Sequence, residues 1–254
     1  MNPSKLFPET REIVEQLQAL SGYPVSYFED GSLRTNATLQ IGTPANPVHL
    51  IRYQPGRGSP DYWIAFEAGN AIRLFRHQAE RRFRLSGSSA YRDQVARDIA
   101  SLQPDLPAEQ QRGLAQFLFD SLMLQVRSMP IGILVDQWIY HRYPTLRSLQ
   151  AEALRAQLPI NETALAPQHA KRFPAIMLKA NRAMNSAFAI AASELLREPH
   201  LAVPYRAAGL ERIGLDLLAE LPDPDAEILD DRALITVWAE RLGITPWLVW
   251  LPFE

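Results

Sequence analysis

Residues 62–84 read YWIAFEAGNAIRLFRHQAERRFR, and the interpretation of the rest of the chain depends on this stretch. Its apolar residues recur at intervals of three and four, at Ile64, Ala68, Ala71, Ile72 and Phe75. This spacing predicts one helix over residues 62–84, with a single apolar stripe that faces a protein core.

Ahead of this helix the sequence pattern changes. Residues 8–20 have helical spacing, but residues 25–28, 37–41 and 48–53 are short β-branched or aromatic runs bounded by glycine- and proline-containing turns. Such runs are typical of β-strands. Because the turns between them are short, we expect a small antiparallel sheet of three strands.

After the helix, helical patterns dominate. We expect helices over residues 89–102, 108–127, 132–142, 145–157, 173–196, 204–221 and 230–242. The apolar residues 244–251 are expected to form a buried strand or a packed tail. The expected fold class is therefore α+β and mostly helical: a small three-stranded antiparallel sheet, a motif helix and a helical C-terminal half.

Composition excludes several classes of protein. The chain has 254 residues, 47% of them hydrophobic and 21% charged, with a formal net charge of -2, as in an ordinary globular protein. It has no cysteine, which excludes disulfides, iron-sulfur clusters, thiolate zinc sites and a cysteine nucleophile. No leader and no membrane-length run of apolar residues is recognised, so the protein is expected to be cytoplasmic, without a membrane partner.

The order of a helix, three strands and a helix that carries Phe66-Glu67-Ala68-Gly69-Asn70 resembles the ImmA/IrrE-like metallopeptidases. In these small zincins the helix after the sheet carries the motif H-E-x-G-H. Glu67 and Gly69 match the motif, whereas Phe66 and Asn70 replace its two histidines. The resemblance implies a degenerate zincin domain over residues 1–128. A helical region over residues 129–254 is expected to pack on it as one cooperative unit.

The two replacements remove the chemistry of the motif. In an H-E-x-x-H helix both histidines bind one zinc ion, and the glutamate activates the zinc-bound water. Phe66 has no lone pair, and the neutral amide of Asn70 is a poor zinc ligand. We therefore expect no metal, no cofactor and no catalytic residue in this degenerate motif. Glu67 is expected either to be paired with an arginine such as Arg73 or to be solvated. Gly69 suggests close packing of the helix against the sheet.

These features predict a pseudoenzyme that binds a protein partner. The resemblance implies a regulatory role in a bacterial stress, mobile-element or phage-defence system, with a helix-turn-helix regulator or a defence effector as the partner. A first alternative is an active metallopeptidase with atypical ligands that cleaves a repressor-type partner. For that alternative, the histidines and acids outside the motif, such as His77, Asp136 and His141, would have to supply the ligands. Their spacing favours a surface histidine at position 77 and a helix-capping histidine at position 141.

A second alternative is binding of nucleic acid or another anion through an arginine-rich segment. Within twelve positions only Glu80 opposes five arginines, namely Arg73, Arg76, Arg81, Arg82 and Arg84. A solvated helix face is the commoner explanation of such a run. Residues 201–254 hold ten acidic residues and four arginines, so this acidic end is not expected to contact nucleic acid.

Overall fold

The structure is a computed structural model that describes residues 6–33, 35–56, 59–222 and 230–253. The α-helices of this part are α1 Pro8–Ser21, α2 Pro60–Arg76, α3 Ser89–Leu102, α4 Ala108–Arg142, α5 Arg147–Glu162, α6 Ala175–Leu196, α7 Val203–Ala207, α8 Glu211–Leu218 and α9 Asp231–Leu242. Its strands are β1 Val25–Glu29, β2 Ala37–Gln40, β3 His49–Tyr53, β4 Phe83–Gly87 and β5 Leu248–Pro252. The expected α+β, mostly helical class is confirmed.

The chain divides into two compact units, each made from separate stretches of sequence. Unit 1 comprises Met1–Arg82, Leu134–Ala156 and Pro252–Glu254. Unit 2 comprises Phe83–Ile133 and Gln157–Leu251. The boundary expected at residue 128 falls inside α4, which supplies residues to both units. Whether the whole chain unfolds as one cooperative unit stays a prediction.

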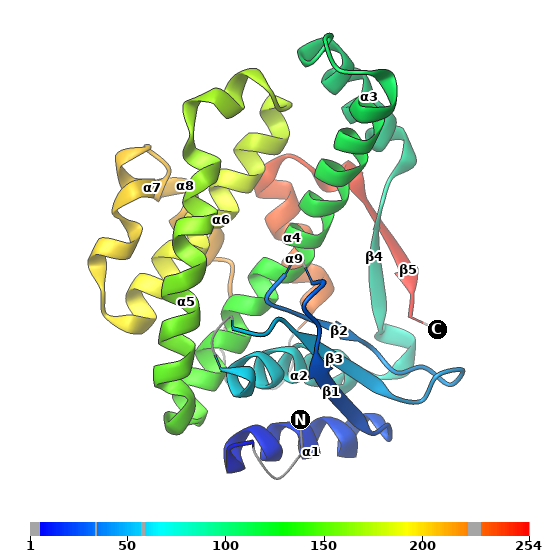
Figure 1. The fold of residues 1–254 in the computed structure, drawn as a ribbon, viewed down its shortest axis with the longest axis vertical. Helices are drawn as coiled ribbons and strands as arrows, with labels where there is room; N and C mark the ends of the chain where they lie inside the picture. Colours follow the sequence, from blue (N-terminus) through cyan, green and yellow to red (C-terminus); the bar gives the residue numbers. More distant parts are fainter. Residues whose placement is uncertain (1–5, 34, 57–58, 223–229, 254) are drawn as a thin grey trace. The chain divides into compact units, whose positions relative to one another are not determined.

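Unit 1 is built on a three-stranded sheet in the order β1-β3-β2 (Figure 1). Helix α1 packs against α2 and β1, and α2 also packs against β2 and β3. The central strand β3 buries His49, Ile51 and Tyr53 on one face. This alternation is what the period of two in a strand requires when one face meets a core.

The sheet is mixed, so the expectation of an antiparallel sheet is wrong for one pair of strands. Strand β2 pairs with β3 antiparallel, but β1 pairs with β3 in parallel. The error arises because β1 and β2 lie on opposite sides of β3. The short turn between them therefore does not close a hairpin, although its length would permit one.

Helix α4 is continuous where two helices were expected. Pro130 lies inside it and cannot donate the hydrogen bond that would reach the carbonyl of Val126. The helix nevertheless continues, because Val126, Ile131 and Ile133 on both sides of the proline are buried. Burial of apolar side chains here outweighs a local cost of about 3 kcal/mol.

In unit 2, α6 packs against α8 and α9 and is buried along most of its length. The helix expected over residues 204–221 is divided into α7 and α8, because Gly209 adopts a φ of 72° between them. A C-terminal strand is present as β5, which pairs with β4 in a two-stranded sheet. Its residues are half-buried or exposed, so the expectation of a buried strand is wrong in this respect.

Candidate functional site

The zincin-like motif lies on α2 in unit 1. Ser59 begins this helix as its N-cap, and its side chain accepts a hydrogen bond from the backbone N–H of Asp61 at 3.3 Å. Gly69 is buried, whereas Phe66, Glu67 and Asn70 are half-buried. The motif residues are therefore carried on an ordered helix at the edge of a core.

The two positions that hold histidine in the family do not form a zinc site here. The Phe66 ring lies 5.9 Å from the ring of Tyr62, measured between centroids. The side-chain N–H of Asn70 donates to the backbone carbonyl of Phe66 at 3.0 Å, so this amide is folded back onto its own helix. Among the residues that the structure describes, no group of three His, Asp or Glu side chains could hold a metal ion. Phe66 and Asn70 therefore do not fit the zinc ion that an H-E-x-x-H helix binds.

Gly69 permits a close approach between helices rather than the expected contact with the sheet. A Cβ atom at this position would lie 2.8 Å from Cγ1 of Val135 and 3.3 Å from the ring of Trp138, both on α4. Real Cβ atoms essentially never approach another atom to less than 3.0 Å. The glycine is therefore required for the packing of α2 against the C-terminal part of α4.

Next to this contact lies a buried polar cluster of Tyr62, Asp136 and Gln150, from α2, α4 and α5. The Tyr62 hydroxyl donates to Oδ1 of Asp136 at 2.7 Å. Nε2 of Gln150 donates both to the same oxygen and to the backbone carbonyl of Asp136, each at 2.8 Å. The side chains are nearly inaccessible to solvent, at 2%, 5% and 0% exposure in that order.

Burial changes the acidity of this cluster. It raises the pKa of Asp136 to about 7, although the hydrogen bonds from Tyr62 and Gln150 favour the carboxylate and oppose the change. Burial also raises the pKa of Tyr62 well above its usual value, and the negative charges of Asp136 and Glu67 add to that effect. The cluster links three helices and contains a carboxyl group with a pKa near neutral pH.

Sequence reasoning did not single out this cluster as a site. Its members are separated by 74 and 14 positions, so no local spacing connects them. One signal was present: Asp136 is the only charged residue between Ile131 and Tyr140, in a stretch apolar enough to be buried. A lone acid in such a stretch indicates a carboxyl group with a specific partner.

The arginine-rich segment is not one helix face. Helix α2 ends at Arg76, and a 3-10 turn over Ala79–Arg81 and strand β4 follow, so the expected helix to residue 84 is wrong. Nε of Arg82 donates to the carbonyl of His77 at 3.1 Å, and its guanidinium lies over the ring of Phe75 at 4.6 Å. Arg82 thus satisfies a carbonyl beyond the end of α2. Arg84 belongs to unit 2, whereas the other four arginines belong to unit 1.

The histidines are likewise dispersed. His77 is the C-cap residue of α2, and His141 is exposed in the last turn of α4. His49 is fully buried, and its Nδ1 accepts the backbone N–H of Gly42 at 3.0 Å. Burial lowers the pKa of His49, so its imidazole is neutral at pH 7.

Strand β2, which packs against α2, is one of the two edge strands of the sheet. Strand β2 is at the end of the sheet order, so no strand pairs with its outer edge among the described residues. In an antiparallel pair of strands, every second residue bonds to the partner strand. The N–H of Gln54 donates to the carbonyl of Asn36, so residue 36 is one of those that bond to the β3 side. Residues 38 and 40 therefore bond to β3, while the N–H groups of Ala37 and Leu39 point to the free edge.

No protein-family model, curated protein or solved structure matches this chain.

Helix α4 is long and apolar enough to cross a membrane when length and composition alone are considered. Its most apolar 18-residue window has a mean hydropathy of 1.3, but 56% of that window is buried in the protein. A buried core helix meets the same criteria, so the helix is weak support for a membrane span.

Proposed function

We propose that this chain is a catalytically inactive, zincin-like interaction module that binds an extended segment of a protein partner along the outer edge of β2. The observation that carries the proposal is that, in the part of the chain that the structure describes, no strand pairs with the outer edge of β2, which lies beside a motif helix without zinc ligands. The family resemblance suggests the setting, a bacterial regulatory or defence system. Within it, a helix-turn-helix regulator or a defence effector is the class of partner to test first.

The chemistry of β2 favours strand addition. Proteins usually protect an edge strand with charged side chains or proline, because its unpaired N–H and C=O groups can pair with another chain. Strand β2 reads Ala-Thr-Leu-Gln and has neither. An added peptide would form main-chain hydrogen bonds with the N–H groups of Ala37 and Leu39 and with the carbonyl of Leu39, while the carbonyl of Ala37 already accepts the Thr35 hydroxyl at 3.0 Å. Such bonds supply affinity without a requirement for one peptide sequence.

Two observations on α2 weigh against the metallopeptidase alternative. Phe66 packs on Tyr62, and the side-chain N–H of Asn70 is bonded to a backbone carbonyl of its own helix. Rearrangement of both would still leave one aromatic and one amide side chain where the chemistry needs two imidazoles.

The test compares two substitutions of one residue. Ala37→Pro removes an N–H that points to the free edge, and Ala37→Val keeps that N–H while adding comparable bulk. Each form is used to capture partners from the cells that express the protein, and hydrogen exchange is measured on the purified complex. We expect a partner that binds the wild type and Ala37→Val alike, that binds Ala37→Pro at least tenfold more weakly, and that protects the amides of Ala37 and Leu39.

Two results would overturn the proposal. Equal capture by Ala37→Pro would show that the edge of β2 is not the site. About one zinc ion per purified chain, together with peptide cleavage abolished by Glu67→Gln, would show that the protein is a metallopeptidase.

A further inference from the structure

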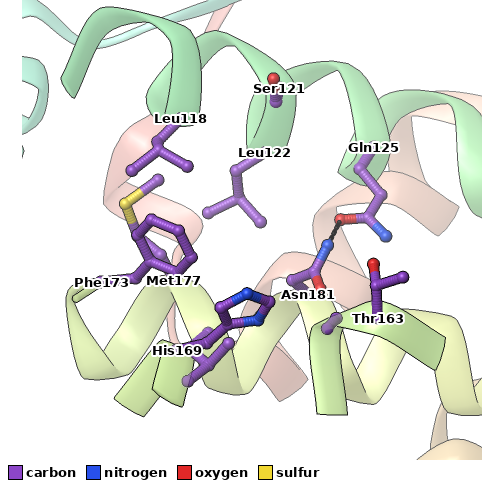
Figure 2. Close-up of a pocket in the computed structure, with 11 residues that line it drawn as sticks. Leu118, Ser121, Leu122, Gln125, Thr163, His169, Phe173, Met177 and Asn181 are labelled. Carbon is purple, nitrogen blue, oxygen red and sulfur yellow. Dashed lines mark hydrogen bonds between the residues drawn. The ribbon is translucent and has the colours of Figure 1, made fainter. Parts of the chain in front are cut away.

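Unit 2 contains a cavity of about 200 Å³ between α4, α6 and the two 3-10 turns Thr163–Leu165 and Pro167–Lys171 (Figure 2). It is smaller than the roughly 300–1,000 Å³ of pockets that hold drug-sized ligands. A single ring system is therefore the size of ligand that suits it. None of the residues that line the cavity belongs to the β2 edge or the α2 motif, so a ligand bound there is separate from the proposed function.

One end of the cavity is apolar. Leu118 and Leu122 of α4 form one side, and Phe173 and Met177 form the other (Figure 2). Leu122 and Met177 are only 3% and 5% exposed. The ring of His169 lies beside that of Phe173, with 5.1 Å between their centroids. This end can bury the body of an apolar or aromatic ligand.

The other end is formed by side-chain amides that are already oriented by one another. Nδ2 of Asn181 donates to Oε1 of Gln125 at 2.8 Å, and Nε2 of Gln125 donates to Oδ1 of Asn185 at 2.8 Å. Nδ2 of Asn185 closes the ring by donating to Oδ1 of Asn181 at 3.2 Å. We call these three residues the amide ring.

The amide ring leaves hydrogen-bonding capacity at the cavity. A primary amide has two N–H donors and two acceptor lone pairs. Within the ring, Gln125 and Asn181 each use one donor and one acceptor, and both of them line the cavity. Each can therefore still donate one hydrogen bond and accept another. Oε1 of Gln125 and Nδ2 of Asn181 lie 2.8 Å apart, so the unused acceptor of the first and the unused donor of the second are neighbours. A ligand edge with a donor beside an acceptor can bond to both of these atoms.

The wall opposite α4 is fixed before any ligand binds. Nε of Arg182 donates to the carbonyl of Ala164 at 2.8 Å, and its Nη2 donates to the carbonyl of Ala166 at 3.3 Å. The carbonyl of His169 accepts the N–H groups of Arg172 and Phe173, each at 3.0 Å. A wall held in this way costs little conformational entropy when a ligand binds.

The charge of the ligand follows from the lining. Apart from His169, no ionisable side chain is found among the described residues that line the cavity. A charged ligand would lose its hydration without gaining an opposite charge. The lining therefore selects a neutral molecule.

We infer that this cavity binds a small neutral heterocycle with a cis-amide edge, the chemistry of uracil and related pyrimidinones. The ring would lie between Leu122 and the Phe173–Met177 side. Its N–H group would donate to the carbonyl of Gln125, and its C=O group would accept the unused N–H of Asn181. The amide ring thus recognises the ligand, in addition to joining α4 to α6 by hydrogen bonds.

The experiment uses three matched probes on the full chain, with binding measured by titration calorimetry and ligand-observed NMR. We expect uracil to bind with a Kd of about 10 μM to 1 mM, which is the range for a ligand of so few atoms. 1,3-Dimethyluracil, in which both N–H groups are blocked, and orotate, which adds a carboxylate to the same ring, should each bind at least tenfold more weakly.

Variants then test whether uracil binds in this cavity. Ser121 and Ser128 are both exposed on α4, two turns apart, but only Ser121 lines the cavity. Ser121→Phe should weaken uracil binding at least tenfold, and Ser128→Phe should leave it unchanged. Gln125→Met should abolish the preference for uracil over 1,3-dimethyluracil.

Three results would overturn the inference. Absence of uracil binding at millimolar concentration would leave the amide ring as a purely structural contact. Equal binding of 1,3-dimethyluracil would refute recognition of the edge, and equal binding of orotate would refute selection for a neutral ligand. None of these results bears on the capture experiment with Ala37 variants, so the two proposals fail separately.

Discussion

Replacement of Asp136 by asparagine should remove a pH dependence of stability that arises in unit 1. Burial raises the pKa of Asp136 from 3.8 to about 7, whereas an aspartate of the unfolded chain keeps its ordinary value. Between those two values the folded chain holds a proton that the unfolded chain has released. The free energy of unfolding must then fall as the pH rises through this interval, and it levels off above pH 7. At about 1.36 kcal/mol per pKa unit, the full decrease is about 4 kcal/mol.

The measurement is urea unfolding of the wild type and of Asp136→Asn, followed by circular dichroism at several pH values between about 4.5 and 8. Titration of all other groups is common to both proteins and cancels in the difference of their unfolding free energies. We expect that difference to shift in favour of Asp136→Asn by about 3 to 4 kcal/mol across the interval. Tyr62→Phe removes a hydrogen bond that favours the carboxylate, so it should move the transition to higher pH. A difference that does not vary with pH would refute the reasoning.

Three further predictions concern the packing, the units and the arginines. Gly69→Ala should lower the free energy of unfolding by about 1–3 kcal/mol, because its Cβ would meet Val135. Gly113→Ala on α4, where no neighbour lies within 4 Å, should instead raise it by about 0.5–1 kcal/mol, and the reverse order in urea unfolding would contradict the packing argument. A fragment of residues 1–128 should not fold into unit 1, because it lacks Val135, Asp136 and Gln150; cooperative unfolding of the purified fragment would disprove this. The full chain should not bind DNA or RNA at about 0.15 M salt in a filter assay, since Arg82 is bonded to backbone carbonyls; submicromolar binding that Arg76→Ala with Arg81→Ala abolishes would show otherwise.

The sequence predicted those elements whose signals are local. The bounds of α3 match the prediction, and those of α1 and β3 differ from it by one residue, because hydrophobic period and turn residues act over a few positions. The errors involve interactions over long separations. Strand β4 was missed, and its first two residues were taken for the end of a helix, because its partner, β5, lies more than 150 positions away. Likewise, the continuity of α4 through Pro130 depends on burial, which local propensity does not record.

The candidate sites show the same division. That Phe66 and Asn70 are not a pair of zinc ligands follows from residue type alone, because no rotamer makes phenylalanine a ligand. The roles of Gly69 and Arg82 did not follow, since their neighbours are determined by packing on α4 and by the end of α2. The amide ring combines residues of α4 and α6 that are some 60 positions apart.

The assembly of unit 1 from separate stretches of chain has a consequence for its synthesis. The sheet and α2 are complete once residue 82 has been made, but the stretch that packs on Gly69 and Tyr62 begins only at Leu134. At about 5–20 residues per second, a ribosome needs roughly 3 to 10 s to make the intervening chain. During this interval the apolar face of α2 that later meets α4 is without its partner. A nascent chain stalled near residue 110 should therefore recruit chaperones that bind apolar surface, whereas one stalled beyond residue 190, with Leu134–Ala156 outside the exit tunnel, should release them.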